Sequence, residues 1–534
     1  MNRYVLCLVG GLSILWFFLG LTSCQSTTPK PAVYHPDQVF GSFFETVQEQ
    51  KVLGDYKTFV DAIPKRAPDS ILADYALQKQ GEHFDLKAFV LVNFELPSPL
   101  PEIQIDPALD MRSHLKQHWK NLVRQPVKTS EWSTQIELPY PYVVPGGRFR
   151  ELFYWDSYFS LLGLLSADED SLALGMIRNF GFLIDEYGYI PNGNRSYFLS
   201  RSQPPFFAAT LRAWGNKHGF ESLLEFLPQL EKEYAFWMDQ SLEQTGLSDS
   251  MAHVIDLFDD HQTNRYYGAK DYARAEGFGK EMRWAQAIPE AERPAFFRNL
   301  RTVCESGWDF STRWYADGKN KSSIHAMDLI PVDLNSLIFM IEDLLYELYE
   351  HKGDSEKMNH YQALSQTRKE WINIYLTDIS EFIYLDYDFV GDSLTNRPSL
   401  AMLYPLFAGC STSDMAQGVA RYVEKHFLQP GGLVTTLVDS GEQWDYPNGW
   451  APHQWIGAIG LINYGYEELG EQIIRNWLAL NEKVYRETGK MMEKYNVVDT
   501  SLIAGGGEYP NQDGFGWTNG VNLAFYDLLD DFPQ

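Results

Sequence analysis

Helical periodicity over long stretches is the feature that most limits how this chain can fold. In segment 333–351, DLNSLIFMIEDLLYELYEH, apolar residues recur every three or four positions and so share one face of a helix. Segments 171–188, 223–239 and 470–489 show the same pattern. Alternation typical of strands is scarce, and no βαβ rhythm appears. The pattern therefore predicts an all-α protein.

Long loops rich in glycine, proline, asparagine and aromatic residues separate the predicted helices, at 141–147, 190–206, 439–452 and 504–520. Helices joined by such loops favour a toroid, in which helix pairs close into a ring and the loops line one mouth. A chain of 534 residues usually forms several domains, and a single continuous barrel is the exception to weigh.

The N-terminal segment reads as an export signal. Residues 1–24, MNRYVLCLVGGLSILWFFLGLTSC, contain a basic residue, an apolar run and small residues that end in cysteine. LTSC resembles a bacterial lipoprotein box; an ordinary signal peptide or an N-terminal membrane anchor is the alternative. We expect residues 1–23 to be removed, Cys24 to be lipidated and residues 24–37 to form a tether. Gln25 is compatible with the outer membrane of a Gram-negative cell, so we expect an anchored protein facing the periplasm or cell surface.

Charge and cysteine content exclude several classes of function. A net charge of −27 argues against a nucleic-acid partner, which would need a basic surface. Without the signal and the lipidated cysteine, only Cys304 and Cys410 remain. Two cysteines allow at most one disulfide and cannot build a metal cluster, so we expect no metal site.

Three Trp-Asp pairs, at 155–156, 308–309 and 444–445, suggest either a repeat fold or a pocket. A propeller would repeat them about every 40–45 residues among strands, and these pairs lie much further apart among helices. The pocket explanation fits better, because aromatic faces and polar side chains together bind neutral sugars. Glycoside hydrolysis needs two carboxyl groups, but composition alone does not select them from 71 acidic residues. A single Asp or Glu is more often a surface group or a helix cap.

Longer motifs carry a family resemblance. PGGRFRELFYWDSY (145–158) and QWDYPNGWAP (443–452) resemble the two signature motifs of trehalases of glycoside hydrolase family 37. The resemblance continues, in family order, through DYKTFVDAIP (55–64), RSQPP (201–205), ESGWDFSTRW (305–314), EKYN (493–496) and GGGEYPNQDGFGWTNGV (505–521). It implies an (α/α)6 barrel with long active-site loops, formed by one catalytic domain at 38–534. It also implies hydrolysis of α,α-trehalose to two glucose molecules with inversion, without a cofactor, by a monomer.

The same resemblance implies the two catalytic carboxyl groups. Asp309, in the GWD motif, matches the family's general acid, and Glu493, in EKY, matches its general base. Inversion requires about 6.5–9.5 Å between the carboxyl groups, to admit a water molecule. The acid must retain its proton near neutral pH, which calls for burial, and Trp308 is a candidate for that shielding. The alternatives are a helix N-cap for Asp309 and an exposed position at a helix end for Glu493.

Sugar contacts follow from the resemblance in the same way. The three arginines that the family requires match Arg148, Arg201 and Arg274; each offers five donors, and an ordinary salt bridge is the alternative role. Further expected contacts are Trp155, Asp156, Asn192, Ser202, Gln203, Ala275, Glu276, Gly307 and Glu508, with the glycine allowing close backbone approach. Trp444 is either an aromatic wall of the pocket or part of the core.

Two departures from the family pattern affect these expectations. The stretch commonly written PRPES is ARAEG here, at 273–277, so two prolines that would stiffen the loop are absent. The glycine run at 505–507 is followed by Glu508, and we expect this loop to close over the sugar.

Three functions remain open from the residues alone. The first is a surface-tethered trehalase, and the second is an inverting α-glucosidase acting on another disaccharide. The third is a lipoprotein that binds sugars without cleaving them. A binding protein would have no reason to keep both Asp309 and Glu493 in family positions, which favours an enzyme.

Overall fold

The computed structural model describes residues 33–98, 108–238, 253–257, 261–502, 504 and 509–532. The predicted signal peptide, the lipidation site Cys24, most of the tether and Glu508 lie outside these ranges. Among the described residues, no helix combines the length and apolar character needed to cross a membrane.

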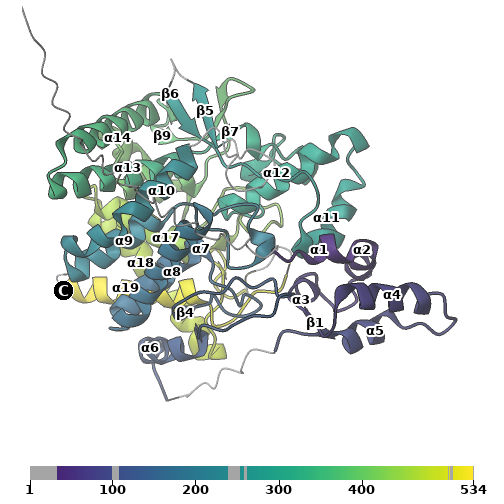
Figure 1. The fold of residues 1–534 in the computed structure, drawn as a ribbon. Helices are drawn as coiled ribbons and strands as arrows, with labels where there is room; N and C mark the ends of the chain where they lie inside the picture. Colours follow the sequence, from purple (N-terminus) through teal and green to yellow (C-terminus); the bar gives the residue numbers. More distant parts are fainter. Residues whose placement is uncertain are drawn as a thin grey trace, which may run out of the picture. The chain divides into compact units, whose positions relative to one another are not determined.

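Six helices of the described chain close a ring in which each contacts the next and the last returns to the first. They are α7 (Tyr154–Ser166), α9 (Phe207–His218), α13 (Val332–Lys352), α15 (Tyr404–Ala408), α17 (Ala451–Ile462) and α19 (Gly516–Asp531). A second set alternates with them along the chain: α6 (Met111–Leu122), α8 (Asp170–Tyr187), α10 (Leu227–Met238), α14 (Ser355–Tyr375), α16 (Ser413–His426) and α18 (Glu467–Thr488). Figure 1 shows several of these helices packed side by side. The predicted all-α class and (α/α)6 barrel are confirmed.

Burial explains why the two sets differ in sequence. The ring helix α17 is buried at nearly every position and is mostly apolar, apart from His453 and Gln454. The second-set helix α18 buries one face, including Ile473, Ile474 and Trp477, and leaves the other face in water. It ends at Gly489, whose positive φ of 69° provides a left-handed C-cap. The amphipathic segments recognised in the sequence correspond to α8, α10, α13 and α18.

Short antiparallel ladders fix the loops. The most important joins β14 (Asn448–Gly449) to β15 (Tyr495–Asn496), and so brings two motifs distant in sequence side by side. The others are β1 (Ile63–Pro64) with β2 (Phe94–Glu95), β3 (Val123–Arg124) with β4 (Tyr142–Val143), β5 (Val254–Leu257) with β6 (His261–Asn264), β8 (Thr377–Asp378) with β9 (Ile383–Tyr384), β12 (Leu428–Gln429) with β13 (Gly432–Leu433), and β10 (Tyr387–Asp388) between β7 (Leu329–Ile330) and β11 (Ser393–Leu394).

The N-terminal part of the described chain has an apolar cluster of its own. Its helices are α1 (Pro36–Phe40), α2 (Ser42–Glu49), α3 (Lys57–Val60), α4 (Pro68–Gln78) and α5 (Leu86–Asn93). Phe43 is fully buried in this cluster, with the rings of Phe59 and Phe89 packed edge-on at centroid distances of 5.9 and 5.7 Å. The cluster also includes Phe153 and Phe198, from loops next to the ring. Helix α2 contacts α11 (Phe278–Ala285), as Figure 1 shows at the end of the purple segment.

Candidate active site

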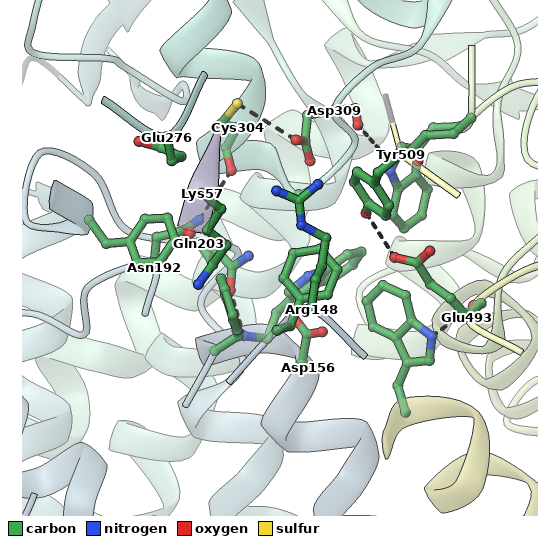
Figure 2. Close-up of a pocket in the computed structure, with 18 of the residues that line it drawn as sticks. Lys57, Arg148, Asp156, Asn192, Gln203, Glu276, Cys304, Asp309, Glu493 and Tyr509 are labelled. Carbon is green, nitrogen blue, oxygen red and sulfur yellow. Dashed lines mark hydrogen bonds between the residues drawn. The ribbon is translucent and has the colours of Figure 1, made fainter. Parts of the chain in front are cut away.

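One cavity collects most of the predicted site residues. It holds about 850 Å³ of empty space, its open mouth included. The predicted residues that line it are Arg148, Trp155, Asp156, Asn192, Arg201, Gln203, Arg274, Glu276, Gly307, Asp309 and Glu493. Figure 2 shows carboxyl, guanidinium and aromatic groups from separate segments converging on this cavity. Folding therefore brings Asp309 and Glu493 to one place.

Asp309 reaches the cavity because α12 (Arg293–Ser306) ends abruptly beside it. Gly307 caps this helix with φ +77°, and a Cβ there would lie 2.9 Å from the Trp155 ring. The N-cap of the next short helix is Ser311, whose side chain accepts from the Arg313 amide, so Asp309 is not that cap. Burial raises the pKa of Asp309, although Arg274, Lys280 and Arg201 oppose the rise.

The thiol of Cys304 is a polar neighbour of the Asp309 carboxyl group. It donates to Oδ2 over 3.8 Å, a long and weak contact, and Arg274 donates to the same sulfur. Cys304 and Cys410 are both buried and are not paired with each other. The Asp309 carboxyl group therefore retains hydrogen-bonding capacity toward the cavity.

Glu493 is held rigidly through its backbone. Its amide donates to the Gln512 carbonyl, and its own carbonyl accepts from Trp517 Nε1, both at 2.9 Å. Its side chain is 1% exposed; Oε1 accepts from the Tyr509 hydroxyl at 2.8 Å, and Oε2 accepts no hydrogen bond from the residues that the structure describes. Burial raises the pKa of Glu493, and Lys494 is the first of the groups that oppose the rise.

A third carboxyl group, Asp156, belongs to the first turn of α7 and lines the same cavity. Burial raises its pKa well above the usual value, and the like charges of Glu493 and Asp309 add to the effect. Burial and the neighbouring carboxyl groups thus favour the protonated form of Asp156, which can donate a hydrogen bond to a sugar hydroxyl.

The arginines combine salt bridges with unused donors. Arg201 Nη2 binds Glu276 Oε1 at 2.9 Å, while Arg201 Nε and Nη1 and Glu276 Oε2 are buried and have no hydrogen-bond partner among the described residues. Burial would raise the pKa of Glu276, but Arg201, Arg274 and Arg301 outweigh it and hold that pKa at about 2. This pair therefore presents a permanent carboxylate and free N–H groups to the cavity, suited to sugar hydroxyls.

Arg148 differs from the other two arginines. It lies 4.0 Å from Asp55, over the ring of Tyr509 at 5.0 Å, and its side chain is 28% exposed. Arg274 is nearly buried and binds Glu281 through both its backbone amide and its Nε. Arg148 is thus the one of the three that can move with the least disturbance to its partners.

The three Trp-Asp pairs have different surroundings. Trp155 and Asp156 line the cavity. Trp308 does not line it but packs behind it, stacked on Trp444 at 6.0 Å and beneath Arg313, whose guanidinium lies 4.4 Å from its ring. The expected shielding of Asp309 therefore comes from the cavity walls as a whole.

Trp444 fills both roles between which the sequence left a choice. It lines the cavity, and it also stacks on Trp450 with ring centroids 3.8 Å apart and planes 5° apart. The neighbouring Asp445 faces away from the cavity. Its carboxylate accepts hydrogen bonds from Ser311, the Thr312 amide and Thr436. Asp445 therefore fixes the loop that carries it to the segment of Ser311 and Thr312.

Two expected sugar contacts do not line the cavity. The hydroxyl of Ser202 donates to the Ile190 carbonyl at 2.7 Å, and its amide donates to Glu305. Ala275 packs in the N-terminal cluster, and its carbonyl accepts from Gln48 at 2.9 Å. Gln203, which does line the cavity, also accepts from the Trp155 amide. Ser202 and Ala275 therefore support the residues around the cavity.

Several lining residues were not predicted: Lys57, Phe149, Phe153, Phe198, Lys280, Cys304, Gln443, Trp450, Tyr509, Phe515 and Trp517. Gln443 and Trp450 belong to the motif at 443–452, and Tyr509 to the motif at 505–521, so the motifs already marked their neighbourhood. Lys57 comes from the N-terminal segment and binds Asp61 and Glu151. Its position in the cavity depends on packing between distant parts of the chain.

Comparison with known proteins decides the family. The trehalase family model matches residues 51–530. The chain belongs to the trehalase family. A periplasmic trehalase of Citrobacter koseri is 41% identical over 517 residues, covering 97% of this chain and 90% of the relative. One of Escherichia coli is 42% identical over 504 residues, covering 94% and 88%.

Solved structures agree with this assignment at the level of the fold. The neutral trehalase of Saccharomyces cerevisiae superposes with a TM-score of 0.62 at 23% identity, covering 91% of this chain and 94% of that one. A GH63 mannosylglycerate hydrolase of Thermus thermophilus reaches 0.51 at 15% identity, covering 78% and 100%. This trehalase-family protein is accordingly a glycoside hydrolase on an (α/α)6 barrel.

Proposed function

We propose that the protein hydrolyses α,α-trehalose to two glucose molecules with inversion, using Asp309 as general acid and Glu493 as general base. Family membership and the periplasmic trehalase relatives support the substrate. The observation that carries the chemistry is that these two carboxyl groups, far apart in sequence, line one aromatic-walled cavity. Residues 38–534 would act together as one catalytic domain.

In the proposed reaction, Asp309 donates its proton to the oxygen between the two sugars. Burial favours the protonated carboxyl group that this step requires. Glu493 accepts a proton from the attacking water through Oε2, the oxygen that accepts no hydrogen bond within the described protein. Tyr509 donates to Oε1 and so fixes the direction in which Oε2 points. The water attacks from the face opposite the leaving sugar, which inverts the anomeric carbon.

Sugar recognition in this proposal relies on groups with unused hydrogen-bonding capacity. Arg201 and Glu276 supply free N–H donors and a carboxylate oxygen, and Asp156 supplies a donor when protonated. The stacked pair Trp444 and Trp450 gives an apolar wall for the C–H faces of a pyranose ring. Glu508 is proposed to add a carboxylate from the loop that follows the glycine run.

We further propose that the protein is exported and remains tethered as a monomer by a lipid on Cys24. The periplasmic relatives support export. A Cys24→Ala chain should leave the membrane fraction and appear in the soluble fraction with its activity intact. Retention of that variant in the membrane fraction would show that another segment anchors the protein.

The substrate is tested by offering trehalose, maltose and kojibiose in parallel and measuring released glucose. The proposal predicts release from trehalose and at most slow release from the other two. Faster release from maltose or kojibiose would identify a different α-glucosidase. Binding of sugar without any release of glucose would show that the protein binds sugars and does not cleave them.

A further inference from the structure

We propose that Gln443 and Lys494 form a clamp that links the general-acid segment to the general base and sets the position and charge state of Glu493. The clamp rests on the proposed function, since it needs Glu493 to act as the base. Neither residue is required to touch the sugar for this role. Both are therefore positioning residues.

Gln443 makes two different hydrogen bonds with the two ends of its side-chain amide. Its Nε2 donates to the backbone carbonyl of Asp309 at 2.6 Å, and its Oε1 accepts from Lys494 Nζ at 3.1 Å. Reversing the amide would place N–H groups against an ammonium and oxygen against a carbonyl, so its orientation is fixed. The side chain is held between the segments that carry Asp309 and Glu493.

The backbone of Gln443 is anchored as well. Its carbonyl accepts from Trp450 Nε1 at 3.0 Å and from Asn448 Nδ2 at 3.1 Å. Asn448 lies in β14, which pairs with β15 just after Lys494. The segment of Gln443 is therefore fixed to the segment of Glu493 by main-chain pairing as well as by the clamp.

Lys494 is an ammonium group enclosed in the protein. The residue is 1% exposed, and Nζ lies 3.6 Å from Glu493 Oε2, the oxygen that accepts no hydrogen bond in the described part of the chain. It also lies over the rings of Trp450 at 5.1 Å and Tyr509 at 5.4 Å. A buried ammonium needs a compensating charge, and the nearby Glu493 carboxylate supplies it.

Within the described chain, the side chains of Lys494, Tyr509 and Arg148 act on the charge of Glu493, and Asp156 lines the same cavity. Lys494 and Arg148 favour its carboxylate, as does the hydrogen bond from Tyr509, and Asp156 adds no opposing charge while it is protonated. Arg148 is partly exposed and so is screened by water, but Lys494 is not. Lys494 is thus the cation best placed to keep Glu493 ionised until the Glu493 carboxylate accepts a proton.

The decisive test is the acidic limb of the pH profile of kcat/KM for trehalose. Removing the positive charge raises the pKa of the base, so Lys494→Met should move this limb to higher pH by about 1–3 units. Lys494→Arg, which keeps the charge, should return the limb to its original place. The pH at which the limb lies does not depend on the fraction of the sample that is folded, so a partly unfolded variant still tests the clamp.

The matched control is Lys490→Met. Lys490 also pairs with a carboxylate, Asp513, at 3.8 Å, but its side chain is 51% exposed and does not line the cavity. This variant should leave the limb unchanged. An unshifted limb in Lys494→Met, or an equal shift in Lys490→Met, overturns the clamp.

Gln443→Met tests the clamp without removing a charge. It should lower kcat about 10- to 100-fold, because the acid segment loses its link to the base, with KM within about twofold. In the double variant with Lys494→Met, the two losses should be less than additive. Full additivity, or an effect on KM alone, contradicts a shared clamp.

The clamp and the proposed function fail in distinguishable ways. If Glu493→Gln keeps full activity, Glu493 is not the base and the proposed function is wrong. If Glu493→Gln is inactive while Lys494→Met keeps the original acidic limb, only the clamp is wrong.

Discussion

At the scale of single residues, Asp309 and Asp445 both follow a tryptophan, yet their carboxyl groups have opposite surroundings. Asp309 faces a cavity, and its carboxyl group accepts a long hydrogen bond from Cys304. Asp445 is fully enclosed and accepts several short hydrogen bonds. The Asp309 carboxyl group is therefore available to react, whereas the Asp445 carboxyl group holds loops together.

This contrast predicts opposite effects of the same substitution. Asp309→Asn should lower kcat by about 10²–10⁴-fold, with a melting temperature close to that of the unaltered protein, because a proton donor is lost but no fold contact. Asp445→Asn should lower the free energy of unfolding by about 1–3 kcal/mol, because an amide cannot accept from all its partners. Glucose release and thermal unfolding measure the two effects. An active Asp309→Asn chain contradicts the acid assignment.

Lys280 provides a second prediction, on the basic limb of the pH profile. Activity falls as pH rises through the pKa of Asp309, since the acid must be protonated. Burial raises that pKa, and the Lys280 charge opposes the rise, so removing the charge raises the pKa further. Lys280→Met should therefore move the basic limb of kcat/KM to higher pH. A limb displaced to lower pH would contradict this electrostatic account.

At the scale of helices and loops, the sequence predicted the amphipathic elements well and the fully buried ones poorly. Helices α8 and α18 were recognised because one face meets water. The predicted loops 439–452 and 504–520 run into α17 and α19, whose first turns are buried on all sides. A helix enclosed by others loses the periodic polar face by which it is recognised in a sequence.

The end of α12 carries the third prediction. Gly307→Ala would place a methyl group 2.9 Å from the Trp155 ring, at a φ of +77° that costs a residue with a side chain about 1–2 kcal/mol. We expect a lower melting temperature and a loss of kcat/KM, since Trp155 and Asp309 both move. Gly353→Ala, at the end of α13 with φ +76° and open space around it, is the control. It should lose stability and keep kcat/KM.

The motifs predicted the catalytic carboxyl groups and the arginines of the candidate site, but two lysines within the same motifs were missed. Asp309, Glu493 and the arginines lie in extended motifs, and these residues line one cavity. Lys57 and Lys494 were missed because a lysine in a sequence is most often a solvated surface group. Only tertiary packing shows that Lys57 lines the cavity and that Lys494 is enclosed beside Glu493.

At the scale of the whole molecule, the N-terminal cluster contributes to a cavity formed mainly by the ring loops. Phe43 is in this cluster with Phe153 and Phe198, both of which line the cavity. Phe43→Ala should cost about 3–5 kcal/mol and also raise KM for trehalose, although Phe43 does not line the cavity.

The control for that prediction is Ile372→Ala in α14, which also creates a cavity in a fully buried position. It should lower the melting temperature without changing KM. An unchanged KM in both variants would show that packing in the N-terminal cluster does not affect substrate binding.

The central claim, trehalose hydrolysis with inversion by Asp309 and Glu493, is tested most directly by proton NMR of the first glucose released. Attack on one anomeric carbon with inversion predicts one β-glucose and one α-glucose for each trehalose at early times, before mutarotation. Two α-glucose molecules would show retention and contradict the assignment of Glu493 as a base that activates water.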